Sequence, residues 1–251
     1  MEPMDAVDVV ILTWNDGALL DTAIASVRAS VGVAARVVVV DNGSEPAVGD
    51  LGDDVRIVRN AENRGVAAGR NTGVQTTTSA IVCFLDSDAE LLPESLARMV
   101  ARLDQHAEVG LVAPTFVDQL PEASAGAAPT LVRKVRRVLG RTDTYSSTAH
   151  RSGASEWDVD FAIGACQVFR RSAFDAVDGL DESYFYGPED ADFCMRLRRA
   201  GWRVLQVADA PVIHPPRRRN RKLLTQRGLR HAWAVTRFLV RHRGFARKVA
   251  R

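Results

Sequence analysis

The fold is decided by the stretch Ile81-Val82-Cys83-Phe84-Leu85-Asp86-Ser87-Asp88, in which five apolar residues run directly into two carboxylates. The apolar run is typical of a buried strand in an α/β sheet. In such sheets, ligands bind beyond the carboxyl ends of the strands. Two carboxylates there can hold a hard divalent cation, and the cation can hold a diphosphate. The competing interpretation is that the Asp-x-Asp triplet arises by chance and only begins a surface loop.

Strand and helix patterns alternate on both sides of this stretch. Short apolar runs predict strands at 7–13, 37–40, 55–58, 109–113, 164–169 and 203–207. Apolar residues at helical spacing and helix-end signals predict helices at 18–30, 66–75, 171–177 and 190–200, with one more that opens at Pro93. This alternation predicts an α/β fold with a mostly parallel central sheet and helices on both faces.

The charge distribution divides the chain. Residues 211–251 hold 13 Lys and Arg and no Asp or Glu, whereas residues 1–210 hold 20 basic and 31 acidic residues. Gly, Ala, Ser, Thr and Pro dominate from about 118 to 156, where no regular pattern is visible. We therefore expect a main domain over 1–210, an irregular insertion at 118–156 inside it, and a basic helical arm over 211–251.

The basic arm suggests an anionic partner: a membrane surface, a lipid-linked phosphate or another polyanion. Its apolar residues Leu229, Trp233, Leu239 and Val240 would let the segment 217–251 lie on an anionic bilayer as an amphipathic helix. The alternative is that these apolar residues pack on the main domain while the basic side chains stay solvated. We expect no nucleic-acid partner.

Several features indicate a cytoplasmic protein. No apolar stretch approaches the ~20 residues that a transmembrane helix needs. The N-terminal residues are acidic and lack the regions of a signal peptide. Three cysteines stand far apart among apolar residues, which fits reduced, buried thiols. We therefore expect a cytoplasmic location, with contact at the inner face of the membrane as the variant that the basic arm suggests.

Two turns follow the first two predicted strands. They are Thr13-Trp14-Asn15-Asp16-Gly17 and Asp41-Asn42-Gly43-Ser44. Polar residues at adjacent strand ends can line a crevice in which a carboxylate accepts hydrogen bonds from a base or ribose. The alternative is ordinary turn chemistry, because Asn-Gly and Asp-Gly are favoured turn formers.

A polar loop, Asn60-Ala61-Glu62-Asn63-Arg64-Gly65, precedes the helix that contains Gly69-Arg70-Asn71-Thr72-Gly73. Arg64 and Arg70 near a helix start could meet a phosphate or a base edge. The segment is neither a Walker loop nor a dinucleotide fingerprint, because its glycines are four residues apart and no Gly-Lys-Ser/Thr is present. A polar loop that caps a helix is the alternative.

Carboxylates also crowd the start of a later helix, in Tyr186-Gly187-Pro188-Glu189-Asp190-Ala191-Asp192. They could supply a general base in a cleft, because crowded carboxylates raise one another's pKa. Simple capping and compensation of the helix dipole is the alternative. His214, after the last strand, becomes a candidate ligand if a cation needs a third one.

Together, these segments resemble the inverting family 2 glycosyltransferases with the GT-A fold, especially their rhamnosyltransferase-like branch. The resemblance covers about Val7 to His214. It rests on the order and spacing of the stretches Val9-Val10-Ile11-Leu12-Thr13-Trp14-Asn15, Val38-Val39-Val40-Asp41-Asn42-Gly43-Ser44, Asn63-Arg64-Gly65, Arg70-Asn71-Thr72-Gly73, Phe84-Leu85-Asp86-Ser87-Asp88, Gly164-Ala165, Gly179-Leu180-Asp181-Glu182, Glu189-Asp190-Ala191-Asp192 and Arg196-Leu197.

The resemblance implies a role for each matching position. The nucleotide donor, with UDP or dTDP as its nucleotide, would be held by Thr13, Trp14, Asn15, Asp41, Asn63, Arg64, Gly65, Arg70, Asp86 and Ser87. A divalent cation, Mn²⁺ or Mg²⁺, would be held by Asp86, Asp88 and His214. Asp190 would be the catalytic base, with Glu189 in support. The implied reaction transfers a sugar from a nucleotide-diphosphate donor to an acceptor hydroxyl, with inversion.

Two departures from the family pattern concern the acceptor. Pro215-Pro216-Arg217-Arg218-Arg219 stands where the branch often has a Gly and a Ser, and the insertion at 118–156 matches no part of the family. Both lie where acceptors usually bind, so the acceptor is left open, with lipid-linked or anionic molecules as candidates.

Two other functions compete with this interpretation. A sugar-phosphate nucleotidyltransferase has a similar sheet and similar metal carboxylates, but it needs a Gly-rich triphosphate loop bearing Lys or Arg after the first strand, which residues 13–17 lack. A non-catalytic module could bind nucleotide sugars and dock on membranes through the basic arm. The carboxylates of Asp86, Asp88 and Asp190 argue against such a module.

Overall fold

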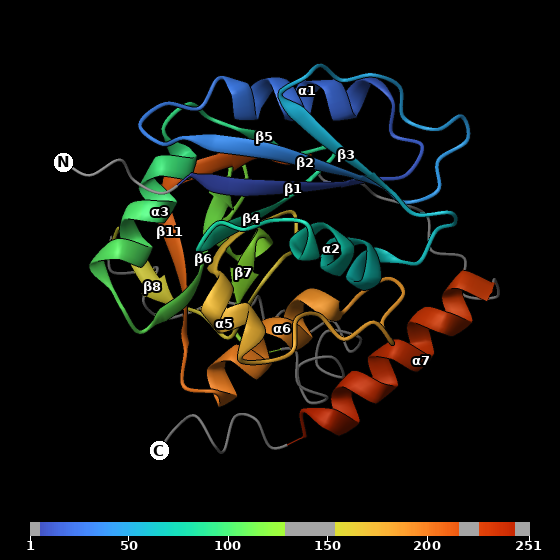
Figure 1. The fold of residues 1–251 in the computed structure, drawn as a ribbon. Helices are drawn as coiled ribbons and strands as arrows, with labels where there is room; N and C mark the ends of the chain where they lie inside the picture. Colours follow the sequence, from blue (N-terminus) through green and yellow to red (C-terminus); the bar gives the residue numbers. More distant parts are fainter. Residues whose placement is uncertain (1–5, 129–153, 216–225, 244–251) are drawn as a thin grey trace.

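A computed structural model of the chain describes residues 6–128, 154–215 and 226–243 (Figure 1). These residues build a mixed α/β sheet with helices against both of its faces. Within the described residues, no helix combines the length and the apolar character needed to cross a bilayer.

The first half of the sheet is parallel, with strand order β3-β2-β1-β4. Its strands are β1 (Val7–Thr13), β2 (Ala35–Asp41), β3 (Val55–Arg59) and β4 (Ile81–Asp86). The strands are rich in valine and bounded by polar turns, which favours pleated, buried backbone. Their parallel order sets the carboxyl ends of β1, β2 and β4 at one edge.

The second half is mixed. β10 (Cys166–Arg170) runs antiparallel between β4 and β6 (Val109–Phe116), and β6 pairs in parallel with β11 (Arg203–Ile213). Two short strands, β5 (Glu90–Leu91) and β8 (Glu156–Asp158), pair antiparallel with β11, and β7 (Ala125–Gly126) pairs with β9 (Phe161–Ala162) in a separate ribbon. The predicted α/β class is confirmed, but local patterns did not indicate the direction of β10.

Helices cover the two faces of the sheet in two groups (Figure 1). On one face lie α1 (Ala18–Arg28) and α3 (Ser95–Gln105), which begins two residues after the expected Pro93. On the other lie α2 (Val66–Gln75), α5 (Arg171–Asp175) and α6 (Glu189–Arg199), joined by α7 (Gln226–Arg241). A short 3₁₀ helix spans Pro121–Ala123.

Alternation along β1 divides the core. Val7, Val9 and Ile11 face α1 and α3, whereas Val10 faces the side of α2. Gly73 lets α2 approach the sheet closely, because a Cβ there would overlap the side chains of Val10 and Val40. The core thus fixes α2, which carries one of the arginines predicted for the site.

The expected division of the chain differs from the structure in two places. The boundary between residues 210 and 211 falls inside β11, which continues to Ile213. In α7, Ala234 and Phe238 are buried in the same apolar cluster as α6, and Leu239 packs against it, while Trp233 and Val240 are exposed. The apolar residues predicted to form one membrane-facing side therefore do not all face solvent, because Leu239 packs on the domain; the side chain of Leu229 lies outside the described residues.

The expected insertion at 118–156 is only partly described. Residues 118–128 contain the 3₁₀ helix and β7, and β8 begins at Glu156, whereas residues 129–153 lie outside the described part of the chain. The basic segment predicted for membrane contact is likewise described only over 226–243.

Candidate active site

The site forms at the edge of the sheet where several strands end. Thr13 pairs with Asp41 across β1 and β2, and Leu12 pairs with Asp86 across β1 and β4. Because β10 is antiparallel to β4, its first residues, not its last, lie at this edge. This edge also receives His214, which directly follows β11.

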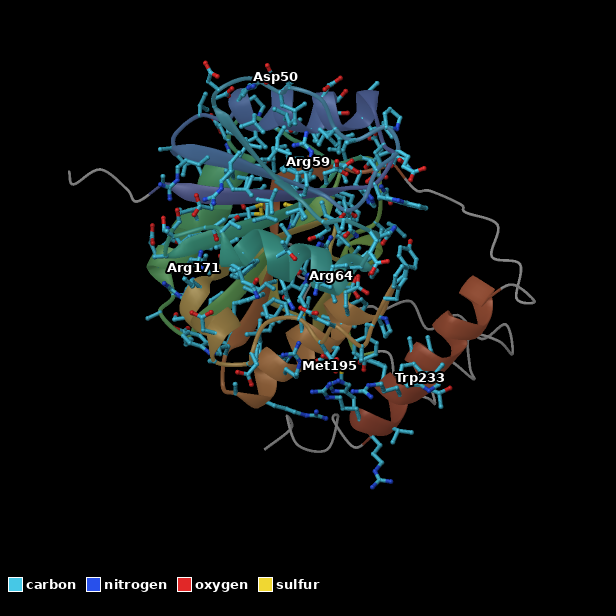
Figure 2. The ribbon with its side chains drawn as sticks, turned by 45° about the vertical axis from the view of Figure 1, so that its right-hand side comes forward. Asp50, Arg59, Arg64, Arg171, Met195 and Trp233 are labelled. Carbon is cyan, nitrogen blue, oxygen red and sulfur yellow. The ribbon has the colours of Figure 1, made fainter. Side chains whose placement is uncertain are left out.

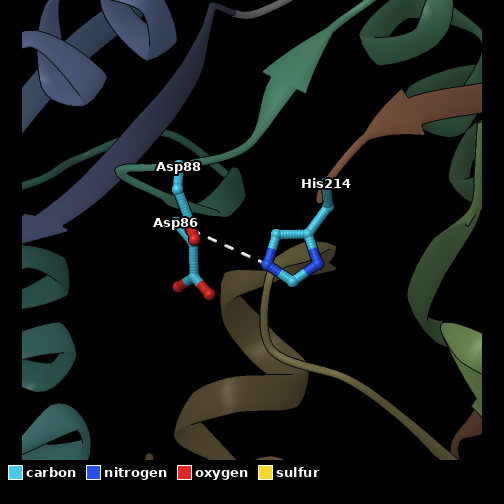
Figure 3. A group of neighbouring side chains, drawn as sticks. All are labelled: Asp86, Asp88 and His214. Atoms are coloured by element: carbon cyan, nitrogen blue, oxygen red, sulfur yellow. Dashed lines mark ion pairs between the residues drawn. The ribbon is translucent and has the colours of Figure 1, made fainter. Parts of the chain in front are cut away.

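Asp86, Asp88 and His214 converge at this edge (Figure 3). One ligand atom from each of the three side chains lies within 4.8 Å of the other two, and His214 Nε2 is 3.6 Å from Asp88 Oδ1. All three side chains are partly shielded from solvent. The ring of Phe116 lies 4.9 Å from the imidazole, centroid to centroid, and restricts its position. Two carboxylates and an imidazole can hold a divalent cation.

Arg70 is a buried arginine at the centre of the site. Its Nη2 donates to Asp86 Oδ1 and to the carbonyl oxygen of Gly164, both at 2.6 Å, and the side chain is 3% exposed. Its guanidinium carbon lies 5.2 Å from the centre of the Phe84 ring. A planar guanidinium with two acceptors is held rigidly. Arg70 therefore fixes one oxygen of Asp86 from the side of α2.

Glu189 and Asp190 begin α6 beside this arginine. The Gly164 amide donates to Asp190 Oδ2 at 3.1 Å, and the Ala191 amide donates to Asp190 Oδ1 at 2.7 Å. Glu189 is 6% exposed, and among the described residues its Oε2 has no hydrogen-bond partner. Gly164 thus joins Arg70 to Asp190 through its carbonyl and its amide.

Both carboxyls at the start of α6 resist ionisation. Burial, with the negative charge of Asp190 added to it, raises the pKa of Glu189 to about 7, although Arg70 opposes the shift. Burial also raises the pKa of Asp190, against the stabilising effect of the Ala191 and Gly164 amides and of Arg70. Raised carboxyl pKa values of this kind are typical of general acids and bases.

The residues of the first two turns that were predicted to hold the nucleotide differ in how far they are buried. Thr13 and Asp41 are buried at 2% exposure, whereas Trp14 is 37% exposed. The two oxygens of Asp41 accept the Ser44 and Val48 amides, each at 2.9 Å. Burial alone would raise the pKa of Asp41, but these hydrogen bonds and Arg59 bring it below the usual value. Asp41 therefore shapes the turn after β2, and a contact with base or ribose stays a prediction.

Asn15 joins the first two turns. Its amide donates to Ser44 Oγ at 3.0 Å, and its Oδ1 accepts the Glu45 amide at 2.8 Å. Its positive φ of 59° is one that Asn tolerates better than most residues. Ser87 connects the first turn to the Asp-x-Asp segment, because its hydroxyl donates to Asp16 Oδ2 at 2.5 Å. The strand-end turns are thus linked to the Asp-x-Asp segment.

The loop before α2 is held by Asn42, which the sequence interpretation did not single out. Its Nδ2 donates to Asn63 Oδ1 and to the Gly65 carbonyl, and its Oδ1 accepts the Arg64 amide. Asn63 Oδ1 also accepts the Gly65 amide at 2.9 Å. Asn63 and Gly65 therefore order the loop. The clue in the sequence was the position of Asn42 directly after Asp41.

Arg64 does not reach the centre of the site. Its side chain is about half exposed and pairs with Glu182 at 3.3 Å, and its Nη1 lies 3.3 Å from Thr72 Oγ1. The structure thus brings together Arg70, Asp86, Asp88, Glu189, Asp190 and His214, and leaves Arg64 at the rim.

Gly164 is a second position to which the sequence interpretation gave no role. A side chain there would overlap the guanidinium of Arg70, and its only signal was the Gly164-Ala165 match.

Comparison with known structures supports the fold. The structure is similar to that of GalNAc-T7 with UDP, GalNAc and Mn²⁺. The TM-score is 0.65 and the sequence identity 17%, over 88% of this chain and 46% of the GalNAc-T7 chain. The mannosyltransferase PcManGT from Pyrobaculum calidifontis, in complex with GDP-Man and Mn²⁺, also gives a TM-score of 0.65, with 18% identity over 94% of this chain and 64% of the other. At such identities the likeness shows a shared GT-A fold.

Sequence comparison identifies the family to which the chain belongs. The chain is 28% identical over 239 residues to the N-acetylglucosaminyl-diphospho-decaprenol L-rhamnosyltransferase of Mycobacterium tuberculosis. The aligned region covers 84% of this chain and 76% of that protein. It is 31% identical over 241 residues to the pre-mycofactocin glycosyltransferase of the same organism, covering 94% of this chain and 48% of the relative. Residues 8–178, more than half of the chain, match Glycosyl transferase family 2, and the chain belongs to that family.

Proposed function

We propose that this protein transfers a sugar from a nucleoside-diphosphate donor to an acceptor hydroxyl, by a metal-dependent direct displacement that inverts the anomeric carbon. The observation that carries this proposal is the convergence of Asp86, Asp88 and His214 at the ligand-binding edge of the sheet. Asp190 is linked to Asp86 through Gly164 and Arg70, and Glu189 precedes it in the first turn of α6.

The three converging side chains fit a divalent cation. Ligand atoms at about 2.0–2.2 Å from an ion lie roughly 3–4 Å from one another, and the 3.6 Å between His214 and Asp88 falls in that range. Arg70 holds one oxygen of Asp86, which leaves the other available. Mn²⁺ and Mg²⁺ both suit carboxylates, and the imidazole favours Mn²⁺. When bound, the cation would neutralise charge on the departing diphosphate.

The donor would lie along the first half of the edge. Trp14 is exposed where it can stack on a base, and Asp41, Thr13 and Asn15 shape the adjoining turns. Arg64 at the rim offers a charge for a phosphate. We propose UDP or dTDP as the nucleotide. The two structural neighbours were solved with UDP and with GDP-Man, which supports a nucleotide sugar as the donor class.

Asp190 would take the proton of the acceptor hydroxyl. A hydroxyl is a weak nucleophile, and a base within hydrogen-bond reach makes it a stronger one as the bond to the sugar carbon forms. The amides of Gly164 and Ala191 orient the two oxygens of Asp190. Glu189 is buried next to it in the chain and, with its own pKa raised by burial and by the charge of Asp190, would stay protonated beside the base. No covalent intermediate on the protein is required.

The acceptor is proposed to be lipid-linked. The relative from M. tuberculosis is named for an acceptor with a diphospho-decaprenol carrier. In this chain, the 13 basic residues of 211–251 would favour the anionic surface at which such an acceptor sits. We therefore propose action at the cytoplasmic face of a membrane, with peripheral contact through 217–251.

Titration calorimetry with UDP and dTDP tests the proposal. Wild-type protein should bind one of them in the presence of Mn²⁺ or Mg²⁺ and lose most of that affinity in EDTA. Asp88→Ala should remove the metal dependence. The matched control, Asp175→Ala, loses an exposed carboxylate of α5 at the opposite edge of the sheet and should behave as wild type. Equal affinity with and without metal, in wild type and Asp88→Ala alike, would contradict the assignment.

A further inference from the structure

The C-terminal helix α7 packs on the domain through one face. Ala234, Phe238 and His242 recur at intervals of four residues and are 3%, 1% and 5% exposed. His242 directly follows the helix, and its amide still donates to the Phe238 carbonyl at 2.9 Å. Trp233 lies on the outward face, where Figure 2 labels it on the outer helix, apart from Met195 on α6.

The inward face of α7 reaches a buried carboxylate in the first turn of α6. Asp192 has no exposed side-chain surface, and its Oδ1 lies 2.7 Å from His242 Nε2. Arg241 Nη1 lies 3.6 Å from the same oxygen, and Arg196 Nε donates to Oδ2 at 2.6 Å. A buried charge needs such partners because it has lost its water. Two of the three cationic or imidazole groups around Asp192 therefore come from the C-terminal segment.

The same segment also holds the loop before α6 and the end of α6. Asp181 in that loop pairs with Arg237 at 3.4 Å and with Arg241. At the other end of α6, Arg199 Nη2 donates to the carbonyl of Arg241 at 3.3 Å. The C-terminal segment therefore holds α6 at two places and the loop before it at a third, and the place nearest to the proposed base is Asp192, two residues after Asp190.

We propose that His242 is a positioning residue for sugar transfer: through Asp192 it fixes the first turn of α6 and, with it, the carboxyl groups of Glu189 and Asp190. The inference rests on the proposed function for its kinetic consequence. Within the described part of the chain, the hydrogen bonds, ion pair and ring contact given for His242 involve Asp192 and Phe238, neither of which is assigned to the metal or the donor. Loss of His242 should therefore lower turnover and spare donor binding.

The kinetic test compares three variants. His242→Ala should lower kcat by about 10–100-fold, since small misplacements of a catalytic group can cost that much. Donor KM and nucleotide affinity should stay within about twofold of wild type. His242→Gln, whose terminal amide can donate to Asp192, should recover most of the lost kcat. Val240→Ala removes an exposed side chain of the same helix and should be neutral.

Hydrogen exchange gives a readout that needs no activity. Amides of the first turn of α6 should exchange faster in His242→Ala than in wild type, and at the wild-type rate in Val240→Ala. If the wild-type protein transfers no sugar, the proposed function fails, and this experiment still decides whether His242 orders α6. If His242→Ala does not fold, His242→Asn replaces it, because its shorter side chain should fall short of Asp192 where Gln does not.

Three results would overturn the proposal. One is a kcat for His242→Ala within about twofold of wild type. Another is a loss of donor affinity as large as the loss of kcat, which would indicate general damage to the fold. The third is a Gln variant that is no better than Ala or Asn in both kcat and exchange of α6, because the hydrogen bond to Asp192 would then have no role.

Discussion

The first half of the molecule, residues 6–101, and the described residues beyond it differ in how fully their buried polar side chains are bonded. In the first half, Asp41, Asn42 and Arg70 each have several hydrogen-bond partners within the protein. Among the described residues, the buried side-chain atoms with neither a hydrogen-bond partner nor an ion pair all lie in the second half: Gln167 Oε1, Tyr184 Oη, Glu189 Oε2, Arg196 Nη2, Asp209 Oδ1 and His242 Nδ1.

This difference in hydrogen bonding indicates that one half of the site is formed by the protein alone and that the other half is incomplete without a ligand or water. Buried polar atoms are normally satisfied, so an unpaired one implies water, a ligand or a strained arrangement. The turns proposed to hold the donor are bonded within the protein before any ligand binds, which would suit rapid capture of a nucleotide. On the acceptor side, Glu189 Oε2 is buried and unpaired beside the proposed base. We infer that the acceptor completes this second half of the site.

The largest expected effect comes from Asp190→Asn. The variant keeps the size of the side chain but cannot accept the acceptor's proton, so kcat should fall by about 10²–10⁴-fold. Metal-dependent nucleotide binding should persist, because the donor half is formed without Asp190. Steady-state kinetics and calorimetry on the same preparation measure both. Asp175→Asn serves as the control, and near-normal turnover in Asp190→Asn would move the role of base to Glu189.

Glu189→Gln should change stability with a distinct pH dependence. The folded-state pKa of about 7 exceeds the unfolded value of 4.5, so the folded protein holds the proton more tightly. Stability from this group is therefore fully present below pH 4.5 and is lost as the pH rises through 7. Gln mimics the protonated form, so the variant should match wild type at pH 4.5 and exceed it by up to about 3 kcal/mol at pH 8.

Urea denaturation at the two pH values measures this difference. The control is Glu182→Gln, which removes a half-exposed carboxyl and should show little change between pH 4.5 and 8. An equal stability difference for Glu189→Gln at both pH values would show that burial does not hold the proton on Glu189.

Gly73→Ala tests the packing that holds α2, and with it Arg70, against the sheet. Alanine favours a helix by about 1 kcal/mol over glycine, but its Cβ would overlap Val10 and Val40 in the core, where overpacking costs about 1–3 kcal/mol. We expect a net loss of about 1–2 kcal/mol in the free energy of unfolding. Gly49→Ala, in an open loop position, should be neutral or slightly stabilising. Equal effects of the two substitutions would refute the close approach.

The sequence predicted the first half of the molecule more completely than the second. The predicted bounds of β1 and α2 agree with the structure to the residue, because each depends on local apolar spacing. The direction of β10 and the packing of α7 depend on pairings between distant segments, which local periodicity does not record. For this reason the basic arm was predicted as an appendage, whereas Phe238 is part of the core.

The candidate site shows the same limit. Residues with reactive side chains, such as Asp86, Asp88 and Asp190, stood out because their chemistry is visible in the sequence. Gly164 did not, because its contribution is a backbone amide, a carbonyl and the absence of a Cβ beside Arg70. Asp41 was predicted to hold the nucleotide, and in the structure its two oxygens are bonded to its own turn. Its contact with a nucleotide, like the other residue roles, stays a prediction.

The smallest expected effect concerns the contact that joins the two halves at the rim, the ion pair between Arg64 and Glu182. Its nitrogen and oxygen are 3.3 Å apart, and both side chains are about half exposed, so water and salt screen the pair. A double-mutant cycle with Arg64→Ala and Glu182→Ala should give a coupling free energy below about 1 kcal/mol, smaller still in high salt.

The two single variants should differ in stability. Glu182 also accepts a hydrogen bond from Asn71 Nδ2 at 3.0 Å, so Glu182→Ala should cost more stability than Arg64→Ala. Arg64→Ala should in addition weaken nucleotide binding if the side chain leaves Glu182 to meet a phosphate. A coupling well above 1 kcal/mol, insensitive to salt, would instead mean that the two halves are locked together at the rim and that the acceptor side is as preformed as the donor side.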